Sequence, residues 1–409
     1  MLSFEVLKQD GQTSARICLM KTAHGVIETP SFVPVATLGS VRSLDSCDLE
    51  ALGVQCALAN TYHLHLKPGD ELIRRLGGLH RFMGFSRPLF SDSGGFQAFS
   101  YGLGREHNIG KIGCIFPQER ADDESARDKK ENKKESKREN LTRISDEGIA
   151  FKSMYDGAWH FFDAERSMRI QSNLGSDIIM AFDECTSPLS DYDYTRRAMQ
   201  RTHDWAGLSL RYHDQNQALY GIVQGGWFED LRRESTEFIA SLPFEGIAIG
   251  GSLGNCKADM HQVLDWVVPG LDERPRHLLG IGEIDDIFEG VQRGMDTFDC
   301  VSPTRIARRG NLYIHPLSGG SVSNKFRINI KSKIYEEDSR PADPLCRCPT
   351  CQSYSRAYLR HLYVARELSY FRLASIHNLH FMMRLMEEIR ESINKGSFFD
   401  LKKRWLEPS

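Results

Sequence analysis

A series of eight short apolar runs is the feature that most constrains how this chain can fold. The runs are rich in Val, Ile and Phe and too short for helices, and most are separated by enough residues for a crossover helix. We therefore expect the buried strands of a parallel sheet. The runs are Pro30–Val35, Val54–Ala59, Pro88–Ser91, Asp177–Phe182, Ala218–Val223, Gly246–Gly250, His277–Ile281 and Thr297–Val301.

Polar residues and glycines follow nearly every run. A barrel of eight β/α units places its active-site residues at the carboxyl ends of all its strands. A doubly wound open sheet, the alternative, would concentrate them at one switch point. The distribution favours an α/β fold of the (β/α)8 TIM barrel type. The polar segments begin at Asn60, Asp92, Asp183, Gln224, Gly251, Gly282 and Asp299.

Two segments lie outside this regular pattern. Residues Phe4–Ile27 alternate moderately in hydropathy and contain Asp10-Gly11, which predicts an N-terminal β-hairpin before the barrel. The stretch Glu119–Asn140 is nearly all charged and has no apolar period. We expect it to be part of a disordered surface insertion at about residues 105–145.

A cluster of three cysteines, Cys346, Cys348 and Cys351, predicts a metal site. Structural zinc takes four sulfur or nitrogen ligands in a tetrahedron. His377, at the start of a helical pattern, is the preferred fourth ligand, and His380 is the alternative. Four available protein ligands predict a closed, structural site with one Zn²⁺ per chain rather than a catalytic one.

The metal ligands also define a second domain. Residues Ser355–Glu367 read as a further helix, so the metal would clamp two helices to a loop. We assign residues 336–409 to this zinc-binding helical subdomain, packed on the barrel, and residues 1–335 to the catalytic barrel domain.

Composition limits where the protein works. The formal net charge is −3, so any contact with nucleic acid must use a local basic patch. No apolar run approaches the length of a membrane span, and Met1–Asp10 lacks the pattern of a secretory signal. Seven of the ten cysteines are scattered rather than arranged as a disulfide framework, which predicts a cytoplasmic protein without membrane contact.

Two carboxylates, Asp92 and Asp299, are predicted at the ends of barrel strands. Paired carboxylates are the usual equipment for chemistry at the anomeric carbon of a sugar, where one attacks and the other moves protons. On these features alone, an ordinary glycosidase would fit as well.

Eight motifs run through the chain in order and are together highly specific. They are SDSGGFQ (Ser91–Gln97), FDEC (Phe182–Cys185), GIVQGG (Gly221–Gly226), AIGGS (Ala248–Ser252), GIGE (Gly280–Glu283), FDCVSPTRIAR (Phe298–Arg308), the Cys346–Cys351 cluster and SIHNL (Ser375–Leu379). In these motifs the chain resembles the tRNA-guanine transglycosylases, or queuine tRNA-ribosyltransferases. The resemblance covers essentially everything except the charged insertion.

The resemblance implies a pentosyltransferase. It would exchange guanine at the anticodon wobble position (34) of tRNAs of the His, Asn, Asp and Tyr type for a 7-deazaguanine base. Asp299 matches the nucleophile, which forms a covalent ribosyl ester at C1′. Asp92 matches the general acid/base. The two half-reactions would give ping-pong kinetics. Neither a redox nor a nucleotide cofactor is needed.

The resemblance also implies a base pocket. Asp183 would accept hydrogen bonds from N1 and the exocyclic amino group of a guanine-like ring, while Gln224 and the N–H of Gly251 would contact its O6 edge. Phe96 and Leu279 would sandwich the ring. The predicted base-binding residues are Phe96, Asp183, Cys185, Gln224, Gly251, Ser252 and Leu279.

Two arginines just after the nucleophile, Arg305 and Arg308, are expected by resemblance to read the uridines beside the target guanosine. Other basic residues could hold the tRNA backbone. These are Arg309, Lys325, Arg327, Lys331 and Lys333. Because the chain ends soon after the zinc region, we expect its target in tRNA to be the anticodon wobble position rather than a position in the D-loop.

One loop bears on the replacement base. Ser252–Asn255 is one residue shorter than the common bacterial pattern, and Gly254 could act as the glycine that makes room for the cyclopentenediol of queuine in eukaryotic enzymes. Cys185 is instead the bacterial-type residue. We expect queuine as the substrate, with the 7-aminomethyl-7-deazaguanine precursor as the alternative.

Assembly is also suggested by the resemblance. The family's symmetric dimer uses the region around Tyr354, Tyr358 and His361, so a homodimer is expected and a heteromer with a non-catalytic homologue is the alternative. A non-catalytic tRNA-binding subunit is a second functional hypothesis, but the presence of both Asp92 and Asp299 argues against it. Arg305 and Arg308 argue against a glycosidase.

Overall fold

A computed structural model of the chain describes residues 2–99, 141–153 and 155–407. Contacts between Cα atoms divide it into two compact units. The first unit comprises Met1–Ala59, Leu79–Phe90 and Pro275–Ser409, and the second comprises Asn60–Gly78 and Ser91–Arg274. The predicted boundary at residue 335 between a barrel domain and a zinc subdomain stays a prediction.

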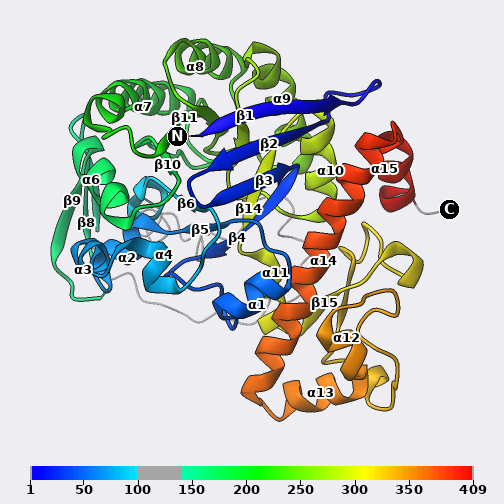
Figure 1. The fold of residues 1–409 in the computed structure, drawn as a ribbon. Coiled ribbons are helices and arrows are strands. Elements are labelled where there is room, and N and C mark those ends of the chain that lie inside the picture. Colours follow the sequence, from blue (N-terminus) through cyan, green and yellow to red (C-terminus); the bar gives the residue numbers. More distant parts are fainter. Residues whose placement is uncertain (1, 100–140, 154, 408–409) are drawn as a thin grey trace. The chain divides into compact units, whose positions relative to one another are not determined.

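Eight strands form a closed barrel in the order β10-β11-β12-β13-β14-β4-β5-β6 (Figure 1). Each strand falls within or next to one of the eight apolar runs, so the predicted TIM barrel is confirmed. The strands are β4 (Ser31–Ala36), β5 (Ala57–Ala59), β6 (Leu89–Ser91), β10 (Ile178–Met180), β11 (Ala218–Val223), β12 (Gly246–Ile249), β13 (Arg276–Leu278) and β14 (Thr297–Cys300).

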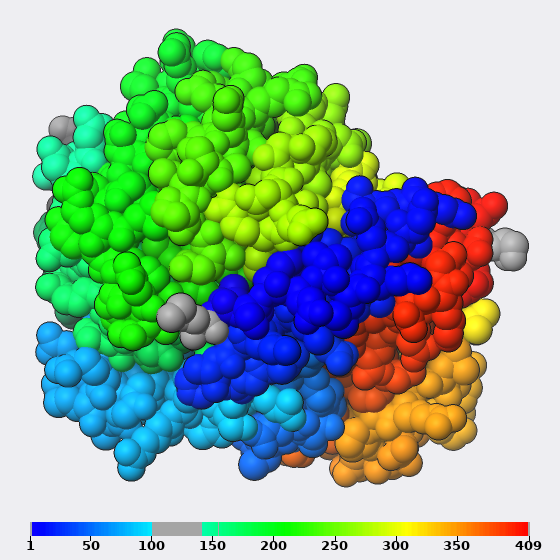
Figure 2. Space-filling view, turned by 45° about the horizontal axis from the view of Figure 1, so that its top comes forward, coloured from blue at the N-terminus to red at the C-terminus, as the bar shows by residue number. Residues whose placement is uncertain are grey.

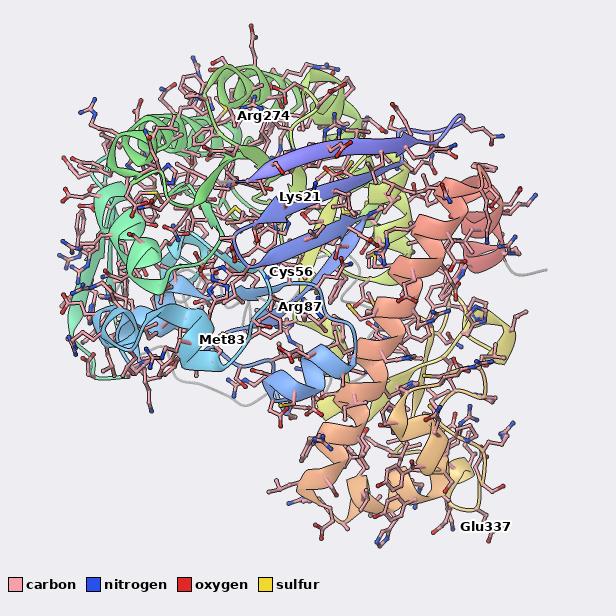
Figure 3. The ribbon with its side chains drawn as sticks, in the orientation of Figure 1. Lys21, Cys56, Met83, Arg87, Arg274 and Glu337 are labelled. Carbon is pink, nitrogen blue, oxygen red and sulfur yellow. The ribbon has the colours of Figure 1, made fainter. Side chains whose placement is uncertain are left out.

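Most barrel strands are largely apolar because both of their faces are covered. All six residues of β11 are buried, and so are all four of β12. The two strands pair in parallel from Tyr220 with Gly246 to Val223 with Ile249. Cys56, labelled in Figure 3, is fully buried immediately before β5. Burial on both faces is what removes the polar alternation of a half-exposed strand.

Helices follow most barrel strands and begin at recognisable caps. Asp163 accepts the N–H of Arg166 at the start of α6, and Asp191 accepts the N–H of Tyr194 at the start of α7. Such side-chain caps satisfy amides that lack a partner within the helix. The helices up to the last barrel strand are α1 (Ser46–Ala51), α2 (Thr61–Leu66), α3 (Asp70–Arg75), α4 (Gly78–Met83), α6 (Ala164–Leu174), α7 (Tyr192–Tyr212), α8 (Glu229–Ser241), α9 (Lys257–Val267) and α10 (Ile284–Gln292).

The predicted N-terminal hairpin is present and gains a third strand. β1 (Ser3–Gln9), β2 (Arg16–Thr22) and β3 (Gly25–Thr29) form an antiparallel sheet in that order. A buried ion pair between Arg16 and Asp296, at 2.6 Å, ties this sheet to the residue before β14. The sheet, in blue, lies beside the red C-terminal helices in Figure 2.

A second antiparallel sheet was not expected from the sequence. β7 (Thr142–Ile144), β8 (Ile149–Lys152) and β9 (Trp159–Phe162) pair in sequence order. β7 occupies residues that were predicted to belong to the disordered insertion, so the prediction is wrong for these residues. The charged stretch Glu119–Asn140 itself lies outside the described residues.

The C-terminal region is helical apart from one small sheet, β15 (Asn311–Tyr313) with β16 (Arg327–Asn329). Its longest helix, α14, packs against α11, β15 and β4 through apolar residues that include Leu379, Met382 and Met386. The predicted helix Ser355–Glu367 is confirmed as α13. The helices are α11 (Ser302–Arg308), α12 (Pro349–Ser353), α13 (Arg356–Val364), α14 (Leu368–Asn394) and α15 (Phe398–Leu406). None of the helices in the described residues is long and apolar enough to cross a membrane.

Candidate active site and metal centre

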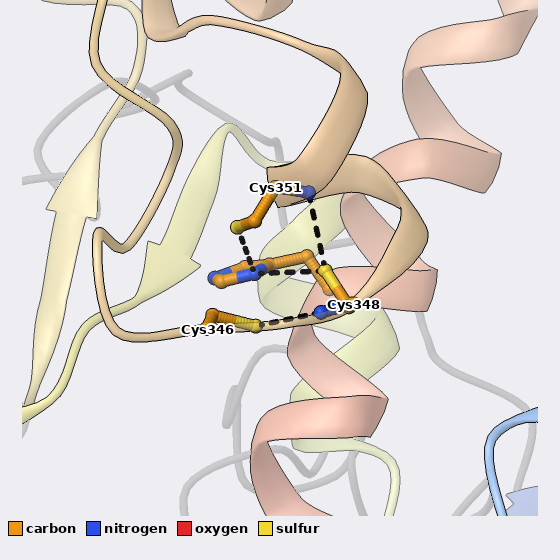
Figure 4. A group of neighbouring side chains, drawn as sticks. Cys346, Cys348 and Cys351 are labelled. Atoms are coloured by element: carbon orange, nitrogen blue, oxygen red, sulfur yellow. Dashed lines mark hydrogen bonds between the residues drawn. The ribbon is translucent and has the colours of Figure 1, made fainter.

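The predicted metal ligands Cys346, Cys348, Cys351 and His377 come together in the first unit (Figure 4). Their ligand atoms all lie within 4.8 Å of one another. Nδ1 of His377 is 3.6 Å from Sγ of Cys348 and 3.2 Å from Sγ of Cys351. A tetrahedral zinc would place such sulfur and nitrogen atoms about 3.6 Å apart. The four residues therefore fit a zinc ion.

Hydrogen bonds around the cluster orient its ligands. Nε2 of His377 lies 2.7 Å from the carbonyl oxygen of Tyr313, so the Nε2–H donates there and Nδ1 keeps its lone pair for a metal. The N–H of Cys351 donates to Sγ of Cys348 at 3.4 Å. The sequence predicts His377 at the start of a helix, but the residue lies well inside α14. The alternative ligand His380 has its Nδ1 3.5 Å from Sγ of Cys346 and is not part of the group of four.

The first carboxylate, Asp92, follows β6 and is half-buried. Its side chain accepts hydrogen bonds from the amide of Asn60 and, at 2.9 Å, from the backbone N–H of Thr61. Asn60 and Thr61 follow β5 in the same unit. Two donors from one neighbouring strand end hold both carboxylate oxygens, so the orientation of Asp92 is fixed before any substrate arrives.

The second unit also holds Asp183, which is 4% exposed. Ser93 donates its hydroxyl to one carboxylate oxygen at 2.7 Å, and the side-chain amide of Gln224 donates to the other at 2.8 Å. Burial raises the pKa of Asp183 to about 6, although these two hydrogen bonds act in the opposite direction. An acceptor pair held this way suits a ligand edge that carries two N–H groups.

Gln224 and Gly251 lie against each other beside this carboxylate. Oε1 of Gln224 is buried and has no hydrogen-bond partner among the described residues, so it remains open to a ligand. Gly251 has φ +79°, and a Cβ there would meet Oε1 of Gln224 at 2.1 Å. Burial raises the pKa of the neighbouring Cys185 thiol. Ser252 is buried as well, at 6% exposed.

The second carboxylate, Asp299, lies on β14 in the first unit and is 9% exposed. Its Oδ1 accepts the backbone N–H of Gly280 at 2.8 Å and lies 3.2 Å from Nε2 of His277. His277 is fully buried, and its Nδ1 is 2.9 Å from the hydroxyl of Thr297. Like Asp92, Asp299 is therefore held in one orientation by neighbouring strand ends.

The two residues predicted to stack on the base are both accessible. Phe96 is 39% exposed, within the helical residues 95–99, and Leu279 is half-exposed in the turn directly after β13. This exposure argues against plain core packing. Because the two residues belong to different units, the sandwich stays a prediction.

The predicted RNA-reading arginines, Arg305 and Arg308, lie on α11. Burial lowers the pKa of Arg308, and the nearby guanidinium groups of Arg42, Arg305 and Arg309 lower it further. Arg308 also donates to the carbonyl of Thr304 at 2.8 Å. A group of arginines that repel one another is typical of a site for a phosphate or another anion.

The other five basic residues differ in their availability. Arg327 forms an ion pair with Glu283 at 2.8 Å, and Lys331 lies over the ring of Tyr363. The side chains of Arg309, Lys325 and Lys333 are exposed. Lys331 is exposed as well, so four of the five fit the expected role of basic residues presented to a backbone, and Arg327 does not.

Four residues that support these groups were not among the predicted site residues. Asn60 and Ser93 lie in segments whose strand-end position is visible in the sequence. His277 lies inside an apolar run, and Arg232 lies on an ordinary amphipathic helix. Nothing in the sequence around His277 or Arg232 distinguishes them from a core histidine or a surface arginine.

Comparison with known proteins gives one consistent answer. The family model described as queuine tRNA-ribosyltransferase matches residues 10–131 and 130–408. A queuine tRNA-ribosyltransferase of Roseiflexus sp. is 43% identical over 99% of both chains, and one of Caldanaerobacter subterraneus is 41% identical over 99% of this chain and 97% of its own. A protein of Archaeoglobus fulgidus that carries this name provisionally is 55% identical over 96% of both chains.

Proposed function

Since the chain belongs to the queuine tRNA-ribosyltransferase family, we propose that it exchanges guanine at the anticodon wobble position of tRNA for queuine. The coarser activity, tRNA-guanine transglycosylation by a pentosyl-transferring enzyme, follows from the family itself. The proposal adds the position, the tRNAs of the His, Asn, Asp and Tyr type, the replacement base and the covalent course of the reaction.

The observation that carries the proposal is the arrangement around Asp183. A guanine-like ring offers N1–H and an exocyclic amino group on one edge, and a carboxylate fixed by Ser93 and Gln224 can accept both. The N–H of Gly251 is a donor suited to O6. Phe96, in the same unit as Asp183, supplies an exposed apolar face for the ring.

Asp299 is the proposed nucleophile. One of its carboxylate oxygens attacks C1′ of the target nucleoside, and the bond from C1′ to N9 of guanine breaks. Asp92 gives its proton to the departing guanine and then takes the N9 proton of the incoming base. N9 of that base attacks C1′, the ester bond to Asp299 breaks, and the carboxylate is restored.

One structural zinc ion, held by Cys346, Cys348, Cys351 and His377, is part of the proposal. Zinc would supply a rigid four-way link between α12, the preceding loop and α14. Neither Asp92 nor Asp299 is among its ligands, so we propose a structural role for this zinc. Thiolate ligands of this kind require a reducing compartment, which supports a cytoplasmic location.

A homodimer is proposed as the working form. Tyr354 and Tyr358 are exposed and stack on each other with ring centroids 5.2 Å apart, and His361 is the next ring along α13. Tyr354 and Tyr358 border a surface hollow of about 540 Å³ that also touches Cys351. Exposed aromatic residues of this kind are typical of interfaces.

The test is base exchange on one purified tRNA with labelled queuine and labelled 7-aminomethyl-7-deazaguanine. We expect both to enter at the wobble position, with queuine preferred. The matched control is the same tRNA with adenosine at that position, which should incorporate neither. Strong preference for the aminomethyl base would contradict the queuine assignment, and incorporation into the control tRNA would contradict the position.

A further inference from the structure

A fully buried arginine, Arg232 on α8, binds four backbone carbonyls. Its Nε donates to Gly226 at 2.8 Å, its Nη1 to Val223 at 3.0 Å, and its Nη2 to both Gly250 and Ser252 at 2.9 Å. No carboxylate pairs with it within the part of the chain that the structure describes. Burial lowers the pKa of Arg232 to about 9, so the guanidinium is still charged at neutral pH.

Those carbonyls belong to the two loops that carry the base-recognition groups. Val223 and Gly226 flank Gln224 after β11, while Gly250 and Ser252 flank Gly251 after β12. The planar guanidinium of Arg232 therefore connects both loops through their backbone carbonyls. Among the described residues, no other side chain forms as many hydrogen bonds to both loops.

The bond to Gly250 fixes the direction of a donor. In a trans peptide the C=O and the following N–H point in opposite directions. Because the carbonyl of Gly250 faces Arg232, the N–H of Gly251 must face away from it. The bond to Ser252 fixes the N–H of Leu253 in the same way.

We propose that Arg232 is a positioning residue for base recognition, which sets the loops of Gln224 and Gly251 at the separation and peptide orientation that a guanine-like base requires. The inference rests on the proposed function. It explains why a charge is kept in a fully buried position without a counter-charge, an arrangement that is costly unless it is well hydrogen-bonded. A lysine offers three donors from one atom and cannot span the same four carbonyls.

Arg274 provides a matched control in the same unit (Figure 3). It also binds three backbone carbonyls, those of Ala240, Leu242 and Phe244, at 2.5–2.9 Å. These carbonyls lie before β12, whereas those bound by Arg232 lie at or after the carboxyl ends of β11 and β12. Loss of carbonyl bonds at Arg274 should therefore cost stability without disturbing base recognition.

The experiment compares Arg232→Lys, Arg232→Gln and Arg274→Lys in the full-length protein. Thermal unfolding gives their stability, calorimetric titration with 7-aminomethyl-7-deazaguanine gives base affinity without tRNA, and a filter assay gives tRNA affinity. We expect both Arg232 variants to lose base affinity by about tenfold or more, since misplacement by about 1 Å is that damaging. Their tRNA affinity should change by less than about twofold, and Arg274→Lys should bind the base normally.

Parallel loss of base and tRNA affinity, or unchanged base affinity in folded Arg232 variants, would overturn the inference. Failure of both Arg232 variants to fold while Arg274→Lys folds would assign Arg232 to folding and overturn it too. Since the titration uses the free base, a wild-type protein that binds the base but does not exchange it into tRNA would refute the proposed function alone.

Discussion

Nε2 of His277 lies 3.2 Å from Oδ1 of Asp299, the same oxygen that accepts the N–H of Gly280 at 2.8 Å. The histidine is fully buried and stacks on Phe90 with ring centroids 5.4 Å apart. In the described part of the chain, the contacts from His277 and from the N–H of Gly280 are both with Oδ1 of Asp299. We propose that Oδ2 is the oxygen presented for attack and that His277, through its close contact with Oδ1, positions the proposed nucleophile.

Replacing His277 by Phe should keep the packing against Phe90 and remove the ring nitrogen near Asp299. We expect kcat for base exchange to fall by about tenfold or more, while the KM values for tRNA and base change little, because only the orientation of the nucleophile is lost. Steady-state kinetics with each substrate varied checks this. His277→Gln, which can still donate to Oδ1, should recover part of kcat. Equal loss in both variants would indicate a role in packing instead.

Base affinity should depend on pH through Asp183. Its pKa is about 6 in the folded protein, and only the ionised carboxylate can accept both N–H groups of the base edge. Affinity for free base should therefore fall as the pH drops below about 6. Titration calorimetry from pH 5 to 8 measures this, with Asp183→Asn as the comparison. A profile of the same shape in Asp183→Asn would assign the dependence to another group.

The same carboxylate should make stability depend on pH. The folded pKa of Asp183 is raised from 3.8 to about 6, so the folded state binds the proton more tightly than the unfolded state does. Its contribution to stability is fully present below pH 3.8 and is lost as the pH rises through about 6. The loss amounts to about 3 kcal/mol. The free energy of unfolding of wild type relative to Asp183→Asn should fall by that order between pH 4 and 7. A flat difference would contradict the raised pKa.

Gly251→Ala should weaken base binding because its Cβ would meet Oε1 of Gln224 and displace the side-chain amide whose Nε2 donates to Asp183. We expect a loss of base affinity of about tenfold or more, measured by calorimetry. Gly53→Ala separates this clash from backbone strain, since Gly53 also has a positive φ, +72°, but nothing lies within 4 Å of its Cβ position. Equal effects of the two substitutions on base affinity would contradict the steric explanation.

Loss of the metal centre should act on folding first. Cys348→Ala removes a buried ligand, one of the four, so we expect a lower unfolding temperature, loss of bound zinc by elemental analysis and, in size-exclusion chromatography, loss of the dimer. Cys47→Ala, at an exposed cysteine, is the control and should change none of these. A metal-free, folded and dimeric Cys348→Ala protein that lacks only exchange activity would show that zinc acts in the reaction.

The barrel could be predicted because parallel strands covered on both faces leave a simple signature. Most of the eight barrel strands are short apolar runs, with polar residues or glycines at or soon after their carboxyl ends. The β7–β8–β9 sheet was missed because its strands are only three or four residues long and border a charged segment. Such strands are held by partners that are not adjacent in sequence, which local periodicity does not record.

Some residues of the candidate site stand out in the sequence, and others do not. Asp92, Asp183 and Asp299 stand out as carboxylates at strand ends, and Cys346–Cys351 stands out by spacing. Their supporting residues do not, because the role of His277 or Arg232 depends on which backbone or carboxylate atoms the fold brings within 3 Å. An arginine on α8 reads as one of many surface charges until its four carbonyl partners are known.

Trapping of a covalent tRNA complex tests the central claim most directly. Purified protein is incubated with substrate tRNA and no replacement base, then separated under denaturing conditions, with wild type, Asp299→Asn and Asp92→Asn compared. The account predicts a denaturant-resistant complex for wild type, with release of guanine, and none for Asp299→Asn, which keeps the shape of the side chain but not the nucleophilic oxygen. A complex of undiminished yield from Asp299→Asn would contradict the account.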